Sequence, residues 1–420
     1  MEGAGMNDAG LAIPRETRRF RKKQEAILDA GARLINQRGV KGTALADIAR
    51  GVGLATNSVT YYYRKKEDLA AACLLSSIRI ISGLAEDAGS EKTPAARIRT
   101  LFASYLELLA AIERGDHAEL VLFNDLRALT GAQAQICFDA YIAMFRSFRQ
   151  LLRGETIVRL TRSEENSRTH LLLSLFVTVK QLARRYDLEE YARTSQRLCD
   201  VLIGGVFAQP IEWPKPEAQK PDANPPGDGE ISTESFLRAA TVLINEQGYR
   251  GASVEKISAY LNVTKGSFYH HNANKDDVVA ACFARSFDIV RAAQNDATAT
   301  LDDGARRLAA IATTLARSQL SGHGPLLRTS AWSALPDEVR YDVLRSMNRQ
   351  TQRFASIIND GQNDGTVKLV DPLIAAHAVS AMINAVAEIE RWVPSVTADN
   401  IVDFYVRPFF VGLASAGSAE

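Results

Sequence analysis

Residues 51–66 read GVGLATNSVTYYYRKK, and residues 260–275 read YLNVTKGSFYHHNANK, on the same plan. The two stretches lie 209 residues apart, and the similarity extends beyond them. Without a gap, 14 of the 47 positions in residues 27–73 (copy one) are identical in residues 236–282 (copy two). Helix formation alone does not require matching glycines and polar residues, so chance similarity between two helices does not explain them. The sequence therefore indicates an internal duplication.

Each copy has the spacing of two short helices that meet at a sharp corner. The corner needs a residue that tolerates positive φ, and Gly53 and Asn262 stand there. Four residues earlier a small side chain lets the helices approach, and six residues later an apolar anchor holds the second helix. These small residues and anchors are Ala49, Ser258, Val59 and Phe268. The pattern predicts a helix-turn-helix in each copy.

The second helix of copy one combines hydroxyls, an amide and aromatic rings. When Val59 is buried, its polar residues fall largely on exposed faces, where they can meet phosphates and base edges in the major groove. Three consecutive tyrosines on a helix cannot all point inward. We expect Tyr61 and Tyr62 to contact DNA and Tyr63 to pack inside, the alternative being that the aromatic run fills a core. The expected contacts are Thr56, Asn57, Ser58, Thr60, Tyr61 and Tyr62.

Lys66 and its counterpart Lys275 begin the next helix in each copy. A cation at that position opposes the helix dipole unless it meets an external anion. We expect that anion to be a DNA phosphate.

Both copies resemble the TetR family of bacterial transcriptional regulators. The family pattern has a glycine, a Thr or Ser that opens the first motif helix, an Ile-Ala pair, a Ser/Thr-x-Tyr-x-His-Phe-like segment and Lys-Asp/Glu-Asp/Glu-Leu. The matching residues are Gly39, Thr43, Ile48, Ala49, Ser58, Tyr62, Tyr63, Lys66, Glu67 and Asp68 in copy one, and Gly248, Ser253, Ile257, Ser258, Ser267, Tyr269, His271, Lys275, Asp276 and Asp277 in copy two. Thr60, Tyr62 and Asn272 depart from the usual tyrosine, histidine and aromatic residue.

The resemblance implies a DNA-binding regulator, expected to be a repressor, that a small-molecule effector releases from its operator. In the family, a C-terminal helical domain binds the ligand and pairs subunits, and ligand binding changes the spacing of the two DNA-reading helices. The resemblance adds Thr43 as an expected DNA contact in copy one. In copy two the expected contacts are Ser253, Lys265, Gly266, Ser267, Tyr269, His270, His271 and Lys275.

The rest of the chain is expected to be all-α. Apolar residues recur at spacings of three and four, as in residues 98–112 and 374–389. Residues 209–230 hold six of the 13 prolines and are expected to be a linker. The expected domains are 1–73 (an N-terminal arm and the first helix-turn-helix domain), 74–208 (the first C-terminal helical domain), 231–282 (the second helix-turn-helix domain) and 283–420 (the second C-terminal ligand-binding and dimerisation domain). We expect the two halves to pair as an intramolecular pseudo-dimer, with a further homodimer as an alternative.

Charge distinguishes the two copies. Residues 1–73 contain 13 basic and 8 acidic residues, whereas residues 231–282 contain five of each. Copy one is therefore expected to carry more of the salt-sensitive affinity for DNA. Because the contact residues differ, the operator is expected to be an imperfect palindrome. In the alternative, copy two no longer contacts DNA and serves pairing or partner binding. Residues 15–23, RETRRFRKK, are either a minor-groove arm or a solvated helix start.

The cysteine spacing and the lack of common catalytic motifs argue against several other functions. Four scattered cysteines predict reduced, buried thiols, and the adjacent His270 and His271 point to different faces, so no metal site is expected. Common catalytic and phosphate-binding motifs are missing, so neither an enzyme nor a cofactor is expected. A cytoplasmic protein is expected because no leader or membrane-length apolar run is found. Either effector pockets or the core could contain Phe102, Tyr105, Phe123, Tyr141, Phe145, Trp332, Phe354 and Met382. No charge cluster indicates the charge of the effector.

Overall fold

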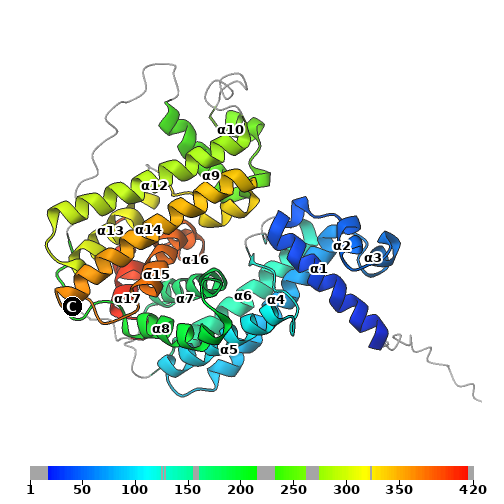
Figure 1. Cartoon of the computed structure of the whole chain (residues 1–420), viewed down its shortest axis with the longest axis horizontal. Coiled ribbons are helices and arrows are strands. Elements are labelled where there is room, and N and C mark those ends of the chain that lie inside the picture. Colours follow the sequence, from blue (N-terminus) through cyan, green and yellow to red (C-terminus); the bar gives the residue numbers. More distant parts are fainter. Residues whose placement is uncertain are drawn as a thin grey trace, which may run out of the picture.

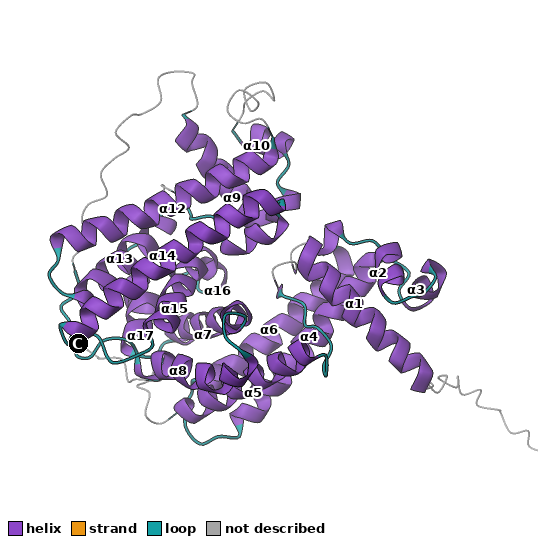
Figure 2. Cartoon of the chain, in the orientation of Figure 1, coloured by secondary structure: helices purple, strands orange, loops and turns teal. Residues whose placement is uncertain are grey.

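A computed structural model of the chain describes residues 18–123, 126, 129–154, 160–214, 232–261, 274–321 and 324–414. Within these ranges the chain is built of helices, and strand-like pairing is limited to an isolated antiparallel bridge between Phe207 and Val367 (Figure 2). The predicted all-α class is confirmed.

The helices of the first half are α1 (Arg18–Gly42), α2 (Leu45–Gly51), α3 (Thr56–Tyr62), α4 (Lys66–Gly89), α5 (Pro94–Arg114), α6 (Gly131–Leu151), α7 (Arg162–Ala183), η2 (Leu188–Glu190) and α8 (Tyr191–Gly204). Those of the second half are α9 (Thr233–Gly251), α10 (Val254–Tyr260), α12 (Lys275–Thr300), α13 (Gly304–Gln319), η3 (Thr329–Ala334), α14 (Asp337–Asn363), α15 (Pro372–Ala385), η4 (Val386–Glu388), α16 (Ile389–Trp392), η5 (Val402–Val406) and α17 (Arg407–Val411). The predicted second motif helix of copy two falls in residues 262–273, outside the described residues.

Local sequence explains where several of these helices begin and end. Thr93 accepts a hydrogen bond from the third amide of α5 while Pro94 occupies its first turn, and Gly115 ends the helix with φ of 81°. Asp371 and Pro372 start α15 in the same way, with the carboxylate accepting from two backbone amides. In both helices the proline occupies the first turn, where its missing amide hydrogen costs no helical hydrogen bond.

The duplication is visible in the first helix of each half. Both α1 and α9 are interrupted by a glycine with positive φ, 67° at Gly39 and 72° at Gly248. Shortly after this glycine, the backbone of each half enters a short helix, α2 or α10, that packs against α1 or α9. A separate apolar core forms under each copy, around Ile48 and Val59 in copy one and around Ile257 and Val278 in copy two. Figure 1 shows these two bundles at different sides of a larger helical body.

The larger body has one core to which both halves contribute. Helices α7 and α8 of the first half both pack against α15 of the second, and α7 also packs against η5 and α16 (Figure 1). At this contact Phe207 stacks on Phe410 with ring centroids 4.6 Å apart, and Trp213 lies against both rings. Residues 209–214, the start of the predicted linker, are therefore packed on the second half, whereas residues 215–231 lie outside the described residues.

Two glycines let the halves approach closely at this contact. Gly205 and Gly412 have positive φ, 71° and 111°, and a Cβ on either would lie 2.3 Å from a backbone carbonyl oxygen of the facing segment. The residue after each glycine, Val206 or Leu413, donates its amide hydrogen to a carbonyl of the other half at 2.8 Å. The crossing therefore requires glycine on both sides.

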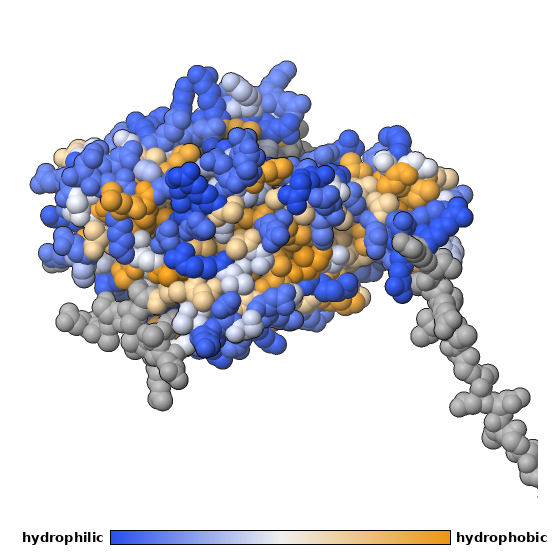
Figure 3. Space-filling model, turned by 60° about the horizontal axis from the view of Figure 1, so that its bottom comes forward, coloured by the Kyte–Doolittle hydropathy of each residue, from blue (hydrophilic) through white to orange (hydrophobic). Residues whose placement is uncertain are grey.

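The cysteines and parts of the most apolar helices are buried inside the protein. All four cysteines are buried and unpaired, as predicted. By length and composition alone, α4 and residues 372–392 are apolar enough to cross a membrane, but half of each apolar window is buried inside the protein. On the face shown in Figure 3, apolar areas interrupt a largely hydrophilic surface, both on the lobe that carries α1 and on the larger body.

Candidate nucleic-acid interface and ligand cavity

The corner between α2 and α3 has the geometry that a helix-turn-helix needs. Gly53 has φ of 65°, and the amide of Leu54 donates to the carbonyl of Ala49 at 2.9 Å, which closes the turn. Ala49 and Val59 are 1% and 0% exposed. The small residue and the apolar anchor therefore hold α3 against α2, and the remaining faces of α3 are left for contacts outside the protein.

The outer face of α3 carries part of the predicted contact set. Thr56 and Asn57 are exposed, Tyr61 is 77% exposed, and Ser58 and Thr60 are half-buried. The Thr60 hydroxyl donates to the carbonyls of Thr56 and Asn57 at 3.3 and 3.1 Å, so it is already paired within the helix. Tyr61 and the two residues that open α3 are thus the side chains best presented to a duplex.

The three consecutive tyrosines differ in burial, because successive residues on a helix point in different directions. Tyr63 is buried at 8% exposure, Gln24 donates to its hydroxyl at 3.4 Å, and burial raises its pKa. Tyr62 is half-buried, and its ring lies 4.6 Å from that of Phe20 in the first turn of α1. Tyr62 therefore lies at the rim of the interface, while Tyr61 projects from it.

Bases of α1 extend the same surface. Arg19, Lys22 and Lys23 surround a shallow hollow beside Val52 and Leu54, next to the α2–α3 corner. Because α1 begins at Arg18, the helix-start interpretation applies to residues 18–23, and residues 15–17 lie outside the described residues. This arrangement gathers positive charge on the side of copy one that also presents α3.

The structure corrects the expectation for Thr43 and qualifies that for Lys66. Thr43 is 5% exposed, and its hydroxyl donates to the carbonyl of Gly39 at 2.9 Å, so it stabilises the kink and is not offered to DNA. The N-cap of α2 is Ala44, one residue later. Lys66 is half-buried at the start of α4 and donates to the carbonyl of Lys41 at 3.2 Å, which leaves two ammonium hydrogens for another acceptor.

In copy two the described residues cover the first motif helix. Ser253 caps α10 by accepting from the amide of Lys256 at 3.3 Å, and Ser258 is buried at 3% exposure. Lys275 begins α12, with its ammonium 4.4 Å from the centre of the Tyr249 ring. The remaining predicted residues fall outside the described residues: Asn262, Lys265, Gly266, Ser267, Phe268, Tyr269, His270 and His271.

Two asparagines at equivalent positions tie each copy to the rest of its half. The first connecting segment, residues 115–130, joins α5 to α6, and the second, residues 320–336, joins α13 to α14. In α1, Asn36 donates to the carbonyl of Leu120 at 2.8 Å and accepts from the amide of Leu122 at 2.9 Å. In α9, Asn245 does the same for Leu326 and Arg328 at 2.9 and 3.0 Å.

A pair of serines completes these clamps. Ser77 of α4 accepts from the amide of Val121, and Ser286 of α12 accepts from that of Leu327, both at 2.9 Å. Sequence reasoning assigned no role to these four polar residues. A signal was available, because each pair is identical at the offset of 209 although helix formation does not demand Asn or Ser.

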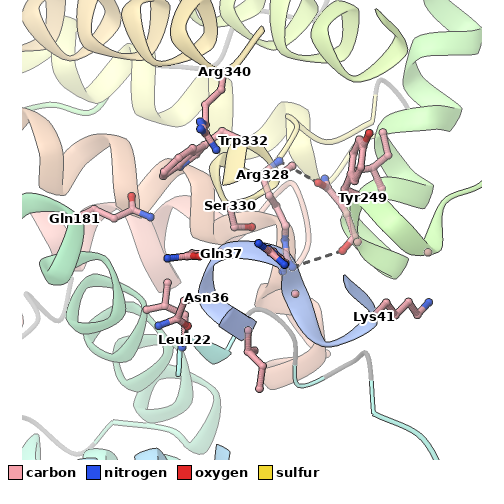
Figure 4. Close-up of a pocket in the computed structure, with 18 of the residues that line it drawn as sticks. Asn36, Gln37, Lys41, Leu122, Gln181, Tyr249, Arg328, Ser330, Trp332 and Arg340 are labelled. Carbon is pink, nitrogen blue, oxygen red and sulfur yellow. Dashed lines mark hydrogen bonds between the residues drawn. The ribbon is translucent and has the colours of Figure 1, made fainter. Parts of the chain in front are cut away.

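A cleft of about 440 Å³ lies between the two copies. Its walls come from the C-terminal ends of α1 and α9, from α7 and from the second connecting segment. Figure 4 shows Gln37 of α1, Tyr249 of α9 and Trp332 of η3 around this space. Trp332, one of the aromatic residues singled out from sequence, therefore lines the cleft.

A larger cavity of about 950 Å³ lies between the halves, and we call it the interface cavity. It is lined by α6, α7 and both connecting segments, and by α15, η4 and α16 of the second half. Three of the expected aromatic residues line it: Phe123, Tyr141 and Phe145. Trp392 of α16 stacks on Phe145, with centroids 4.3 Å apart. The other candidates, Phe102, Tyr105, Phe354 and Met382, are at most 3% exposed and belong to the core.

Arginines dominate the charged lining of the interface cavity. They are Arg146, Arg149, Arg162, Arg328 and Arg391, and the carboxylate among the lining residues is that of Glu388, which forms an ion pair with Arg328. No local sequence pattern indicates this cluster, because its members come from α6, α7, the second connecting segment and α16.

Arg149 is the most deeply placed of these cations. It is 8% exposed, and its Nη1 donates to Oδ1 of Asn166 at 3.0 Å, whereas its Nε has no hydrogen-bond partner. Burial lowers the pKa of Arg149, and nearby Arg162 acts in the same direction. Burying this guanidinium carries a desolvation cost, which an anion in the cavity would offset.

His170, another buried polar residue of the cavity lining, has a partner within the protein. His170 lies 3.1 Å from the hydroxyl of Tyr405 across the two halves, and burial lowers its pKa to about 3, so it is neutral near pH 7. Over the described ranges, no group of three or more His, Cys, Asp and Glu side chains is arranged to hold a metal ion.

Comparison with known proteins places both copies in one family. The family model described as "Bacterial regulatory proteins, tetR family" matches residues 27–73 and again residues 236–282. The chain is 30% identical over 172 residues to the HTH-type transcriptional repressor DhaR of Mycobacterium sp. (strain GP1), covering 38% of this chain and 83% of DhaR.

Two further matches differ in extent. The Transposon Tn10 TetC protein of Escherichia coli is 37% identical over 59 residues, which are 14% of this chain and 30% of TetC. Among solved structures, the TetR family transcriptional regulator PfmR from Thermus thermophilus is 22% identical, with a TM-score of 0.36 over 42% of this chain and 98% of PfmR. The chain belongs to the TetR family of DNA-binding regulators, as a tandem member with two copies of the family's N-terminal module in one polypeptide.

Proposed function

We propose that the chain is a repressor that binds an imperfect palindrome with two non-identical readers and is released by a small-molecule effector. The observation that carries this proposal is the duplication: the family's N-terminal module occurs twice, 209 residues apart, and both halves of the chain contribute to one shared core. A regulator that reads two half-sites needs two recognition helices about 34 to 36 Å apart. Pairing of the halves through α7, α8, α15, η5 and α17 would supply both from one chain.

The readers are expected to prefer different half-sites. Copy one would contact DNA through Thr56, Asn57, Ser58, Thr60, Tyr61, Tyr62 and Lys66, and copy two through Ser253, Lys265, Gly266, Ser267, Tyr269, His270, His271 and Lys275. At four matched positions copy one has Thr56, Asn57, Thr60 and Tyr62, and copy two has Lys265, Gly266, Tyr269 and His271. Side chains of such different hydrogen-bonding capacity favour different bases.

Release is proposed to run through the asparagine clamps. Both connecting segments wall the interface cavity, and each is bonded to its own copy by Asn36 or Asn245. An effector that binds more tightly to a DNA-incompetent arrangement would shift both copies together. The cleft supports this route because Leu122, Gln181, Arg328 and Ser330 line both it and the interface cavity.

The test begins with the DNA that the pure chain retains from sheared genomic fragments. The enriched site would be footprinted, and the mass of the protein–DNA complex would be measured by light scattering. One chain on two dissimilar half-sites is expected. Two chains on identical half-sites, each occupied by copy one, would overturn the single-chain proposal and favour a homodimer.

The neutral charge of copy two favours one alternative, in which this copy pairs or binds a partner without touching DNA. The double variant Y269A/K275Q and its counterpart Y61A/K66Q separate the two proposals. If both readers contact DNA, each double variant weakens operator binding. If only Y61A/K66Q does so, while circular dichroism shows both variants folded, copy two is not a reader.

A further inference from the structure

We propose that the interface cavity binds one amphipathic anion per chain, with its acidic group at Arg149 and its apolar body against the aromatic wall. This inference rests on the proposed function, because it names the chemical class of the effector. It assigns both the charge of the ligand and a stoichiometry of one, set by a cavity that the two halves build together.

The size and apolar lining fit a molecule with a substantial hydrocarbon or aromatic part. A cavity of about 950 Å³ is in the range that takes drug-sized ligands. Phe145 and Trp392 present stacked rings, Tyr141 lies 5.6 Å from Trp392, and the Phe123 ring meets that of Tyr141 edge-on at 5.3 Å. Such a wall excludes a small, fully hydrated ion as the preferred occupant.

The charge of the lining selects an anion. Glu165, beside the cavity, is shared among three guanidinium groups, 3.1 Å from Arg153, 3.6 Å from Arg162 and 4.0 Å from Arg149. One carboxylate cannot balance three cations, and the lining carboxylate Glu388 is already paired with an arginine. A carboxylate or phosphate group would lie against the guanidinium of Arg149, which lines the cavity.

More exposed arginines surround this inner cation. Arg146 of α6, Arg162 of α7 and Arg391 of α16 line the same cavity and are exposed to solvent. They would attract an anion to the opening and disfavour a cation. Because α16 belongs to the second half and α6 and α7 to the first, one molecule would contact both halves at once.

The test is isothermal titration calorimetry of the full chain without DNA. Four probes share an eight-carbon chain: octanoate, octyl phosphate, octanol and octylamine. At least one anion is expected to bind about tenfold more tightly than octanol, at one molecule per chain, and octylamine is expected to bind most weakly. The two anions distinguish a carboxylate from a phosphate ligand.

Variants locate the site. R149Q retains a polar group near Asn166 and is expected to lower anion affinity about tenfold while leaving that for octanol unchanged. If R149Q does not fold, R146Q/R391Q replaces exposed residues and is expected to act in the same direction. R99Q is the control, because Arg99 lies on α5 and pairs with Asp200 away from the cavity. An R99Q loss equal to that of R149Q would overturn the assignment.

Other results also overturn the inference: equal affinity for octanol and both anions, two molecules per chain, or no binding of any probe. These outcomes are separate from failure of the proposed function because calorimetry is done without DNA. A chain that retains no genomic fragment but binds octanoate refutes the repressor proposal alone. A chain that binds its operator but discriminates no anion refutes the ligand class alone.

Discussion

Replacing Gly205 with alanine tests the crossing between the halves. Gly205 has φ of 71° and ψ of −178°, a region that is essentially restricted to glycine, so a side chain there costs about 1 to 3 kcal/mol. The new atom would also lie 2.3 Å from the Phe410 carbonyl oxygen and 2.6 Å from the Gly412 nitrogen, so the facing backbone must move. Overpacking of this kind adds about 1 to 3 kcal/mol. We therefore expect G205A to lower the free energy of unfolding by roughly 2 to 6 kcal/mol.

Urea unfolding followed by tryptophan fluorescence measures this loss, since Trp213 lies against Phe410 at the crossing. G83A is the matched control. Gly83 is inside α4, and a Cβ there meets no atom within 4 Å, so this change is expected to stabilise the helix by about 0.5 to 1 kcal/mol. If the unfolding free energy of G205A stays within about 0.5 kcal/mol of the parent, the argument from close approach is refuted.

Three further outcomes are expected. N245A removes the side-chain amide that bonds the Leu326 carbonyl and the Arg328 amide, so we expect the free energy of unfolding to fall by about 1 to 3 kcal/mol. Hydrogen exchange in residues 326–328 should become faster, and unchanged exchange would mean that Asn245 does not hold this segment. Y61A should leave the urea midpoint unchanged but weaken DNA binding, whereas V59A should lower the free energy of unfolding by roughly 2 kcal/mol. If Y61A destabilised the protein and V59A did not, the assigned outer and inner faces of α3 would be wrong. In the folded protein the pKa of His170 is about 3, below its unfolded value, so this residue costs stability as the pH falls from about 6.5 towards 3. H170Q should reduce the pH dependence of the unfolding free energy by up to about 1.4 kcal/mol per pH unit. An unchanged pH profile would contradict a buried, neutral His170.

The helix-turn-helix was predictable because its constraints are local. Gly53, Ala49 and Val59 lie within eleven residues, and each has one geometric task that few residue types perform. The all-α class followed from apolar periodicity in the same way. Thr43 was wrongly predicted to contact DNA. The kink at Gly39 turns its hydroxyl inward, and the order of residues in the sequence does not show this change in backbone direction.

The interface cavity was not predictable because its walls are distant in the sequence. Arg149 and Arg391 meet only when α6 and α16 are brought to one cavity by the packing of the two halves. The aromatic candidates divide among the cleft, the interface cavity and the core, and this division depends on that packing. Phe145 and Phe102 have the same local environment in the sequence, an apolar helix, and differ only in what faces them.

A common core in one polypeptide also changes how such a protein responds to dilution. Separate subunits come apart as their concentration falls, because association depends on mass action. Helices α7 and α15 belong to the same chain, so their contact persists when a cell holds only a handful of molecules. In the proposed single-chain arrangement, each copy would keep its partner copy at any concentration, and the two could diverge in sequence without mispairing between different chains.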